Sequence, residues 1–444
     1  MKLTNLASAS VIIEHGDTKI LVDPWLEDGE FYGSWFHYPP LNLDYSMFDD
    51  VDYIYISHIH PDHLSKKTLN KINKNIPVLI HKWDSKFVKN NLEKVGRKVI
   101  ELNHGEKFHC GDNLYIKIYS ADNCNPALCD KMLGCGKVEK EFGSTNIDTM
   151  CVFECDGKTI LNINDCPYEL SEDVLDLILR EHKKIDVLLV GYTGAGAYPQ
   201  CWDCYTEDEK VKIYGPNKKK KLLNMGLQFL NKVNPINYMP FAGTYTLGGS
   251  RHHLESLKGT PKLSEALEFY EKFYGSGGFL LNQFESFNLE TKLVSKEYVE
   301  DNDIEKQKYI LNVLSHKKYD YEYDPNPILT EFENLLPMAY NRFNNKRKQL
   351  DFTTDTNVYV ILPDKKCVKI SFNGGGYSII DSKNINEDNK RVVYDLDHRL
   401  LYRILRGPRH AHWNNAEIGS HINFYRKPEI YERALYYCMN FFHK

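Results

Sequence analysis

The segment 57–63 (SHIHPDH) constrains this chain more than any other feature of its sequence. It follows directly on the apolar run 51–56 (VDYIYI), which predicts a strand. Alternate residues leaving a strand point to the same side, so His58 and His60 can converge on one ion. Pro61 turns the chain, which lets Asp62 and His63 face a second ion nearby. Imidazole and carboxylate ligands together suit zinc, iron or manganese. The sequence therefore predicts a site for two metal ions.

Short β-branched runs separated by turn signals surround this segment. Residues 10–15 (SVIIEH) and 18–23 (TKILVD) flank Gly16-Asp17 and predict a hairpin. CVFEC and KTILNIN flank Asp156-Gly157 and predict a second one. Further strands are expected over 77–80, 97–102, 113–119 and 185–190. Strands with intervening helices predict a layered α/β domain with mixed sheets.

The pattern H-x-H-x-D-H after a strand resembles the signature of the metallo-β-lactamase superfamily. The resemblance implies an αββα sandwich, and it makes Asp62 a catalytic residue as well as a ligand. The upstream ILVDP resembles that family's second strand, which implies that Asp23 orients a ligand imidazole without touching the metal. ILNINDC resembles the later strand that ends in a bridging aspartate, which implies that Asp165 is shared by both metals.

Two ligand positions depart from the pattern of the family's hydrolases, which have a third histidine before the bridging aspartate and a last one after a late strand. For the third position we expect Asp122, because the predicted strand 113–119 runs into it; the alternative is that Asp122 is a plain loop residue. For the last position the candidates are His252 and His253, of which we take His253; both could instead be plain loop residues. A carboxylate in place of an imidazole favours iron or manganese over zinc.

Longer phrases resemble the catalytic region of the CMP-N-acetylneuraminate hydroxylase family. They fall between residues 20 and 243 and include ILVDPW, DYIYISHIHPDHLS, DTMCVFECDGKTILNINDC and KKKKLLNMGLQFLNKVNPINYMPFAG. That resemblance implies a sugar-like or nucleotide-like polar substrate and a di-iron oxygenase. The hydroxylases receive electrons through a Rieske iron–sulfur domain, whose paired Cys and His motifs are not found in this sequence. A separate electron carrier, or electrons from the substrate, would then be needed.

Three functions remain open from the sequence. The first is a di-iron oxygenase of a polar metabolite. The second is a metal-dependent hydrolase (a phosphodiesterase, lactonase or amidase) in which the metals activate water as the nucleophile. The third is a binding protein that keeps the fold without a complete ligand set. Fold alone cannot decide among them, because function resides in the site.

The glycine-rich segment GYTGAGAYPQCWDC follows the predicted strand 185–190. Its glycines allow a close backbone approach to a ligand. Tyr192, Tyr198 and Trp202 could then pack on a sugar or a base, and we take them as candidate substrate-binding residues. The alternative is an ordinary loop.

The length of 444 residues predicts more than one domain. We assign 1–260 to the metal-binding domain, 261–346 to a helical connection and 347–444 to a smaller C-terminal α+β domain. The end of the chain loosely resembles sterol-carrier-like domains. We expect the C-terminal domain to wall the pocket or to join two subunits of a homo-oligomer.

Composition narrows the partners. The formal net charge of −5 gives no reason to expect nucleic acid, and no apolar stretch is long enough to span a membrane. The N-terminus has no signal-peptide core, so we expect a cytoplasmic protein. Most of the eleven cysteines are then expected to be free thiols; the group Cys124, Cys129 and Cys135 could hold a metal, but no fourth ligand with standard spacing accompanies it.

Overall fold

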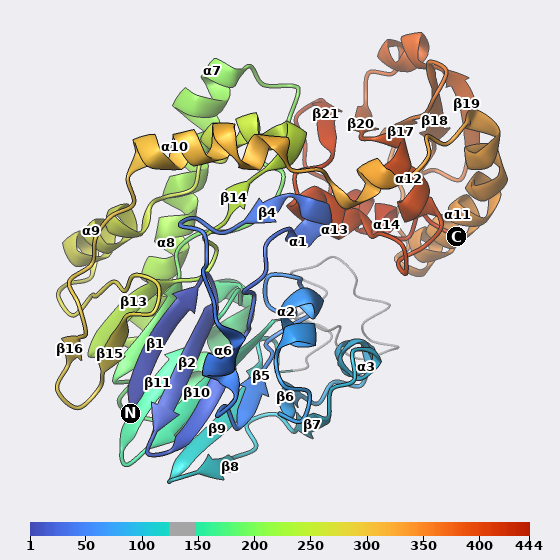
Figure 1. Ribbon diagram of the computed structural model, residues 1–444. Helices are drawn as coiled ribbons and strands as arrows, with labels where there is room; N and C mark the ends of the chain where they lie inside the picture. The colour runs from blue at the N-terminus through green and yellow to red at the C-terminus, as the bar shows by residue number, and fades with distance from the viewer. Residues whose placement is uncertain (124–147) are drawn as a thin grey trace.

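The computed structural model describes residues 1–123 and 148–444, and the cysteine group at 124–135 lies outside them. Two sheets stack face to face in the first part of the chain (Figure 1). The first has the order β16-β15-β1-β2-β3-β5-β6-β7. Its strands are β1 Lys2–Ala7, β2 Ser10–His15, β3 Thr18–Val22, β5 Tyr53–Tyr55, β6 Val78–His81, β7 Val99–Leu102, β15 Ser286–Asn288 and β16 Leu293–Val294.

The second sheet has the order β13-β12-β11-β10-β9-β8. Its strands are β8 Phe108–Gly111, β9 Leu114–Ser120, β10 Thr149–Cys155, β11 Lys158–Asn162, β12 Val187–Gly191 and β13 Asn237–Phe241. One apolar core fills the space between the two sheets, with members such as Val11, Tyr55, Ile118 and Phe153. Two-sided burial of this kind is what the β-branched runs of the sequence favour.

Helices cover both outer faces. On the first sheet lie α2 Lys66–Lys71 and α3 Phe87–Lys94, which share a core with Ile54 and Val78. On the second lie α6 Tyr168–Glu181, α8 Gly215–Val233 and α9 Leu263–Phe273, which share a core with Leu161 and Leu188. This arrangement confirms the predicted αββα sandwich.

Both predicted hairpins are present. β2 pairs with β3 antiparallel, with Val11 opposite Val22. β10 pairs with β11 around Asp156 and Gly157, whose φ angles of 46° and 76° are those of the tight hairpin turn that such a pair favours. β3 and β5 run parallel, so Asp23 and His58, which follow them, lie at the same end of the first sheet's strands. The beginning of β10 and the end of β11, in the second sheet, face these strand ends.

The C-terminal part is a five-stranded sheet in the order β19-β18-β17-β20-β21. Its strands are β17 Asn357–Ile361, β18 Lys366–Ile370, β19 Tyr377–Asp381, β20 Arg391–Asp395 and β21 Asn423–Lys427. The helices around it are α11 Leu329–Gln349, α12 His398–Leu405, α13 Trp413–Ile418 and α14 Arg433–Met439. Their apolar side chains share one core with the sheet, which also reaches Trp25 and Trp35 of the first part.

The predicted division of 261–346 and 347–444 needs two corrections. β15 and β16 of the supposed helical connection extend the first sheet beside β1. α11 begins at Leu329 and buries Phe332, Leu336 and Phe343 in the C-terminal core, so the boundary at 347 cuts through a helix whose apolar stripe belongs to that core. The reason is helical periodicity, which places these residues on one face.

The remaining elements connect these parts. β4 Trp35–Phe36 pairs with β14 Thr246–Leu247, and short helices are α1 Glu30–Gly33, α7 Glu207–Glu209 and α10 Asp303–Asn312. Short segments of 3₁₀ or π helix occur at Tyr45–Phe48, Lys210–Tyr214, Gly249–Leu257, Leu314–His316, Asp320–Tyr323 and Ser382–Glu387. Within residues 1–123 and 148–444, none of the helices combines the length and the apolar character that a membrane span requires.

Candidate metal centre

Five predicted ligands lie together at the strand ends where the two sheets face each other. The donor atoms of His58, His60 and Asp165 are all within 4.8 Å of one another, and so are those of Asp62, His63 and Asp165. Asp165 therefore belongs to both groups, which is the placement expected of a bridging ligand. Two-metal sites hold their ions about 3.5–4 Å apart, and two overlapping groups of this size can do so.

Each imidazole presents one nitrogen to the cluster. His58 Nε2 lies 2.9 Å from His60 Nδ1. His63 Nε2 lies 3.5 Å from Asp165 Oδ2 and 3.7 Å from Asp62 Oδ2. The opposite nitrogens of these rings contact other protein groups, which fixes the direction of the three rings.

Asp23 supports the cluster from beneath, as the resemblance implied. Its side chain is fully buried and accepts the Ser57 backbone N–H at 2.7 Å and the Ser57 hydroxyl at 2.6 Å. Its Oδ2 also lies 2.9 Å from His63 Nδ1. Ser57 Oγ in turn lies 3.0 Å from His58 Nδ1. One carboxylate thus orients two ligand imidazoles, the arrangement by which supporting groups tune metal ligands.

A further carboxylate at the cluster is absent from the sequence prediction. Asp148 Oδ1 lies 3.3 Å from His58 Nε2. Its neighbour Thr149 begins β10, donates its hydroxyl to the Ser57 carbonyl at 2.7 Å and accepts the Asn164 side-chain N–H at 2.8 Å on its own carbonyl. These hydrogen bonds of Thr149 hold Asp148 next to the histidines. The signal that could have found it is its place directly before a buried strand that faces the motif.

Asp122, the residue predicted for this position, lies elsewhere. It follows β9, is buried, and accepts the Ser120 hydroxyl at 2.7 Å. Its charge acts on His104, opposing the burial that lowers the pKa of that imidazole. Neither group of converging donors in the described residues includes Asp122. β9 and β10 are neighbouring strands. The carboxylate at the cluster therefore comes from Asp148, just before β10, instead of from Asp122, just after β9.

His252 and His253 are not brought to the cluster. Both lie in the turn Gly249–Leu257, where His253 is exposed and His252 Nδ1 lies 3.0 Å from the Gly249 carbonyl. Burial lowers the pKa of His253, and the nearby charge of Arg251 lowers it further. The prediction of His253 as the last ligand therefore has no support in this geometry, because the turn carries both rings away after Gly248.

Burial and neighbouring charges shift the pKa values of the cluster in both directions. Against the effect of burial, the charges of Asp23, Asp165 and Asp62 raise the pKa of His63 well above its ordinary value. Burial lowers the pKa of His58 to about 3 and that of His60 to about 4. Burial likewise raises the pKa of Asp62 to about 7 and that of Asp148 to about 6, with Asp165 adding to both. Divalent cations bind imidazoles and carboxylates in their deprotonated forms, and the imidazoles of His58 and His60 are held neutral here. The residues present therefore fit two metal ions.

A cavity of about 250 Å³ opens beside the cluster. His60, Asp62, Asp148 and Asp165 line it, and Asp165 is 40% exposed because it faces this space. Most of the remaining wall is apolar, from residues such as Met225, Phe229, Phe241 and Ile418. Within the described residues, three buried polar atoms of the wall lack a hydrogen-bond partner, namely Trp35 Nε1, Asn164 Oδ1 and Thr193 Oγ1. They offer a ligand one indole donor, one amide acceptor and one hydroxyl that can donate or accept.

The C-terminal part also reaches this site. Ile418 of α13 is part of the cavity wall, and the Asn414 side-chain amide lies 3.2 Å from His60 Nε2. α13 is held against α1, since the Tyr32 hydroxyl accepts the His412 backbone N–H at 2.7 Å. The predicted C-terminal wall of the pocket is thus present at this point.

The three aromatic residues of the glycine-rich loop are placed away from that cavity. Trp202 is 6% exposed and stacks on Phe424, with ring centroids 5.2 Å apart. Tyr198 packs edge-on against Trp202. Tyr192 is buried and lines a separate cavity of about 380 Å³. The loop's aromatics join the two parts of the chain, so the substrate contacts predicted for Tyr198 and Trp202 have no support here.

Known proteins with similar sequences agree with this architecture. A family model described as a beta-lactamase superfamily domain matches residues 2–210. The cytidine monophosphate-N-acetylneuraminic acid hydroxylase of Danio rerio is 30% identical over 256 residues, which cover 55% of this chain and 38% of that protein. The aligned region thus spans less than half of this relative's length.

Solved structures give weaker likenesses. An isothiocyanate hydrolase from Delia radicum gut bacteria has a TM-score of 0.44 at 17% identity, covering 65% of this chain and 99% of its own. A diiron beta-hydroxylase from Streptomyces venezuelae has a TM-score of 0.40 at 14% identity, covering 65% and 54%.

Proposed function

Residues 2–210 belong to the beta-lactamase superfamily, and from that premise we propose that this protein is a dinuclear metal enzyme, an oxygenase of a polar sugar- or nucleotide-like metabolite. His58, His60 and Asp148 would hold one ion, Asp62 and His63 the other, and Asp165 both. Two iron ions bound there would supply the redox chemistry that activates dioxygen.

The observation that carries the oxygenase proposal is the carboxylate of Asp148 beside His58, at 3.3 Å from Nε2. Hydrolases of the superfamily resemble this chain in the motif but have a histidine at the third ligand position. With Asp148 there, the donors are three imidazoles and three carboxylates, and harder oxygen ligands favour iron or manganese over zinc. The relative in Danio rerio, which is named a hydroxylase, supports the same choice.

The cavity suits a small polar group held among apolar walls. Trp35 Nε1–H can donate to a substrate oxygen, and Asn164 Oδ1 can accept from a substrate hydroxyl or amide. A buried polar atom without a partner is costly, so a ligand that pairs with both is favoured. Phe229 and Phe241 keep water away from the space in which the substrate would react. We propose that a separate electron carrier supplies the reductant.

The test is the reaction of the iron form with dioxygen. Protein reconstituted with iron without oxygen and then chemically reduced should consume dioxygen on mixing, whereas the zinc form should not. The Asp165→Ala variant should lose this consumption, and the Lys296→Ala variant, changed at an exposed loop, should retain it. An inert iron form together with a zinc form that cleaves phosphodiesters, lactones or amides would replace the oxygenase by the hydrolase.

A further inference from the structure

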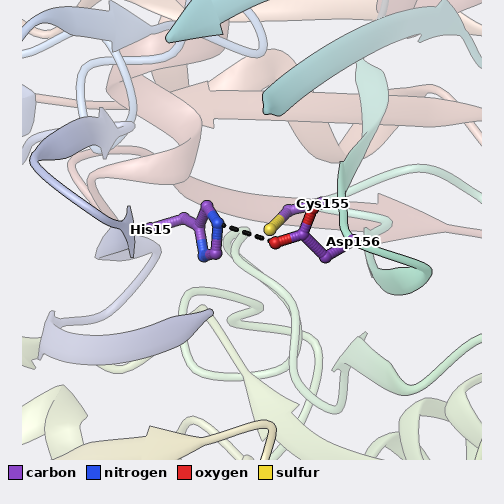
Figure 2. Close-up of side chains that lie close together, drawn as sticks. All are labelled: His15, Cys155 and Asp156. Carbon is purple, nitrogen blue, oxygen red and sulfur yellow. Dashed lines mark ion pairs between the residues drawn. The ribbon is translucent and has the colours of Figure 1, made fainter. Parts of the chain in front are cut away.

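A second group of metal-ligand side chains lies outside the centre described above. His15, Cys155 and Asp156 converge so that their donor atoms are within 4.8 Å of one another (Figure 2). His15 Nε2 lies 3.1 Å from Asp156 Oδ2. Figure 2 shows the sulfur of Cys155 beside the same carboxylate, with the imidazole facing both. An imidazole, a thiol and a carboxylate are the three side-chain types that zinc binds most often.

The topology places this group at the end of the sandwich opposite the candidate active site. β10 begins at Thr149, next to Asp148, and ends at Cys155. At about 3.3 Å per residue its seven residues span roughly 20 Å. β2 likewise ends at His15, while its first residue, Ser10, donates its hydroxyl to the Asp23 carbonyl. The two groups therefore sit at opposite ends of the same strands.

The three donors come from both sheets. His15 ends a strand of the first sheet, whereas Cys155 and Asp156 end a strand and open a turn of the second. The hairpin turn fixes Asp156 in a left-handed conformation, with φ of 46°, which sets its carboxylate beside the sulfur of the preceding residue. Cys155 is 3% exposed at the rim of the core between the sheets, so the sulfur is shielded while the other two donors meet solvent.

We propose that His15, Cys155 and Asp156 form a mononuclear zinc site that ties the two sheets together at this end of the sandwich. Three protein ligands leave a fourth position of a tetrahedral zinc for water. Binding releases the thiol proton to solvent and leaves the sulfur as thiolate, without any change of oxidation state. Burial raises the pKa of the Cys155 thiol to about 11, with the Asp156 charge adding to it. The site does not depend on the proposed oxygenase function.

Cobalt(II) tests this site selectively, because a thiolate ligand gives Co²⁺ an intense near-ultraviolet absorption that imidazole and carboxylate ligands do not. The full chain titrated with cobalt should show this band and should bind one ion more than Cys155→Ser, which should lack the band. Cys110→Ser changes another buried cysteine of the same core and should keep it. A band that persists unchanged in Cys155→Ser would overturn the proposal.

Two further variants guard against a folding defect in Cys155→Ser. Asp156→Asn keeps a residue that tolerates the left-handed turn, and His15→Ala changes a side chain that is 24% exposed. Each should weaken cobalt binding at this site at least tenfold, while cobalt at the other centre is retained. Zinc should raise the melting temperature of the wild-type chain more than that of either variant. Equal shifts in all three, with equal cobalt affinities, would reject the site whatever the outcome at the other centre.

Discussion

The amide of Asn414 lies 3.2 Å from Nε2 of His60, across 354 positions of the sequence. His60 Nδ1 faces His58, so Asn414 occupies the side of the ring that points away from the cluster. If Nδ1 binds a metal, Nε2 carries the proton and needs an acceptor, which the amide oxygen of Asn414 supplies after rotation of the amide by half a turn. The C-terminal part of the chain thereby helps to orient a ligand of the N-terminal part.

Replacement of Asn414 by Leu should weaken metal binding at the His60 site. Loss of a partner that orients a ligand imidazole typically costs about 10- to 100-fold in affinity. Competition with a chelator, followed by metal analysis, measures this directly. Asn217→Leu, at an exposed position of α8, is the matched control and should leave the affinity unchanged. Equal affinities in both variants would show that Asn414 merely packs against the ring.

Asp148 and Asp122 make a second comparison. Asp148→Ala should lose at least one ion, because its carboxylate lies at the histidine cluster. Asp122→Ala should keep both ions and lose the hydrogen bond from Ser120, which by itself costs about 1 kcal/mol in the free energy of unfolding. Metal content and urea unfolding of the two proteins decide the matter. The reverse pattern would restore Asp122 as the ligand.

Asp23 is expected to matter for both stability and metal binding. Asp23→Ala leaves the buried Ser57 N–H without its acceptor and frees the His63 ring. An unsatisfied buried group of this kind costs about 1–3 kcal/mol, and the metal affinity should fall as well. Asp23→Asn retains an acceptor for Ser57, so unfolding measurements should show it to be the milder variant. A wild-type metal affinity in Asp23→Ala would remove its assigned role.

Glu30 gives a pH dependence of stability. Burial raises its pKa to about 7, although the Ser65 hydroxyl, which donates to Oε1 at 2.6 Å, works against this rise. The folded state thus holds a proton that the unfolded chain releases near pH 4.5. Its contribution to stability is complete below that pH and is lost as the pH rises towards 7.

Replacement by Gln removes this loss while keeping an acceptor for Ser65. Glu30→Gln should therefore be more stable than wild type at pH 8, by at most about 3 kcal/mol, and nearly equal to it at pH 4.5. Urea unfolding at both pH values measures the difference, with Glu297→Gln as a control at an exposed site. A stabilisation that is the same at both pH values would show that ionisation of Glu30 is not its source.

Local features of the fold could be predicted from the sequence, and distant contacts could not. The hairpins at Gly16 and Asp156 follow from turn chemistry and alternation within about fifteen residues. The motif at 57–63 likewise lies on one strand end, so its convergence is a local matter. Asp165 can be predicted only through family resemblance, since it joins the histidines only when the second sheet packs on the first.

The residues for which the structure differs from the sequence prediction, or which the prediction lacks, all depend on tertiary contacts. Asp148 directly precedes β10, and the pairing of that strand with β9 and the hydrogen bond from Thr149 to Ser57 bring it to the histidines. From the sequence alone, Trp202 resembles a residue on which a ligand could stack, but Phe424 of the C-terminal sheet stacks on its ring instead. Asn414 carries no local signal at all. In each case the missing information is which distant segment packs against the residue.

The central claim is that two metal ions bind at the cluster around Asp165. Protein purified without oxygen and without chelator should contain about two ions per chain at this centre, in iron-replete cells mostly iron, when the chain carries Cys155→Ser to exclude the second site. Asp165→Ala in the same background should lose both ions, since it removes the shared ligand. Fewer than about 0.3 ions per chain in the parent protein, or an undiminished metal content after Asp165→Ala, would contradict the account.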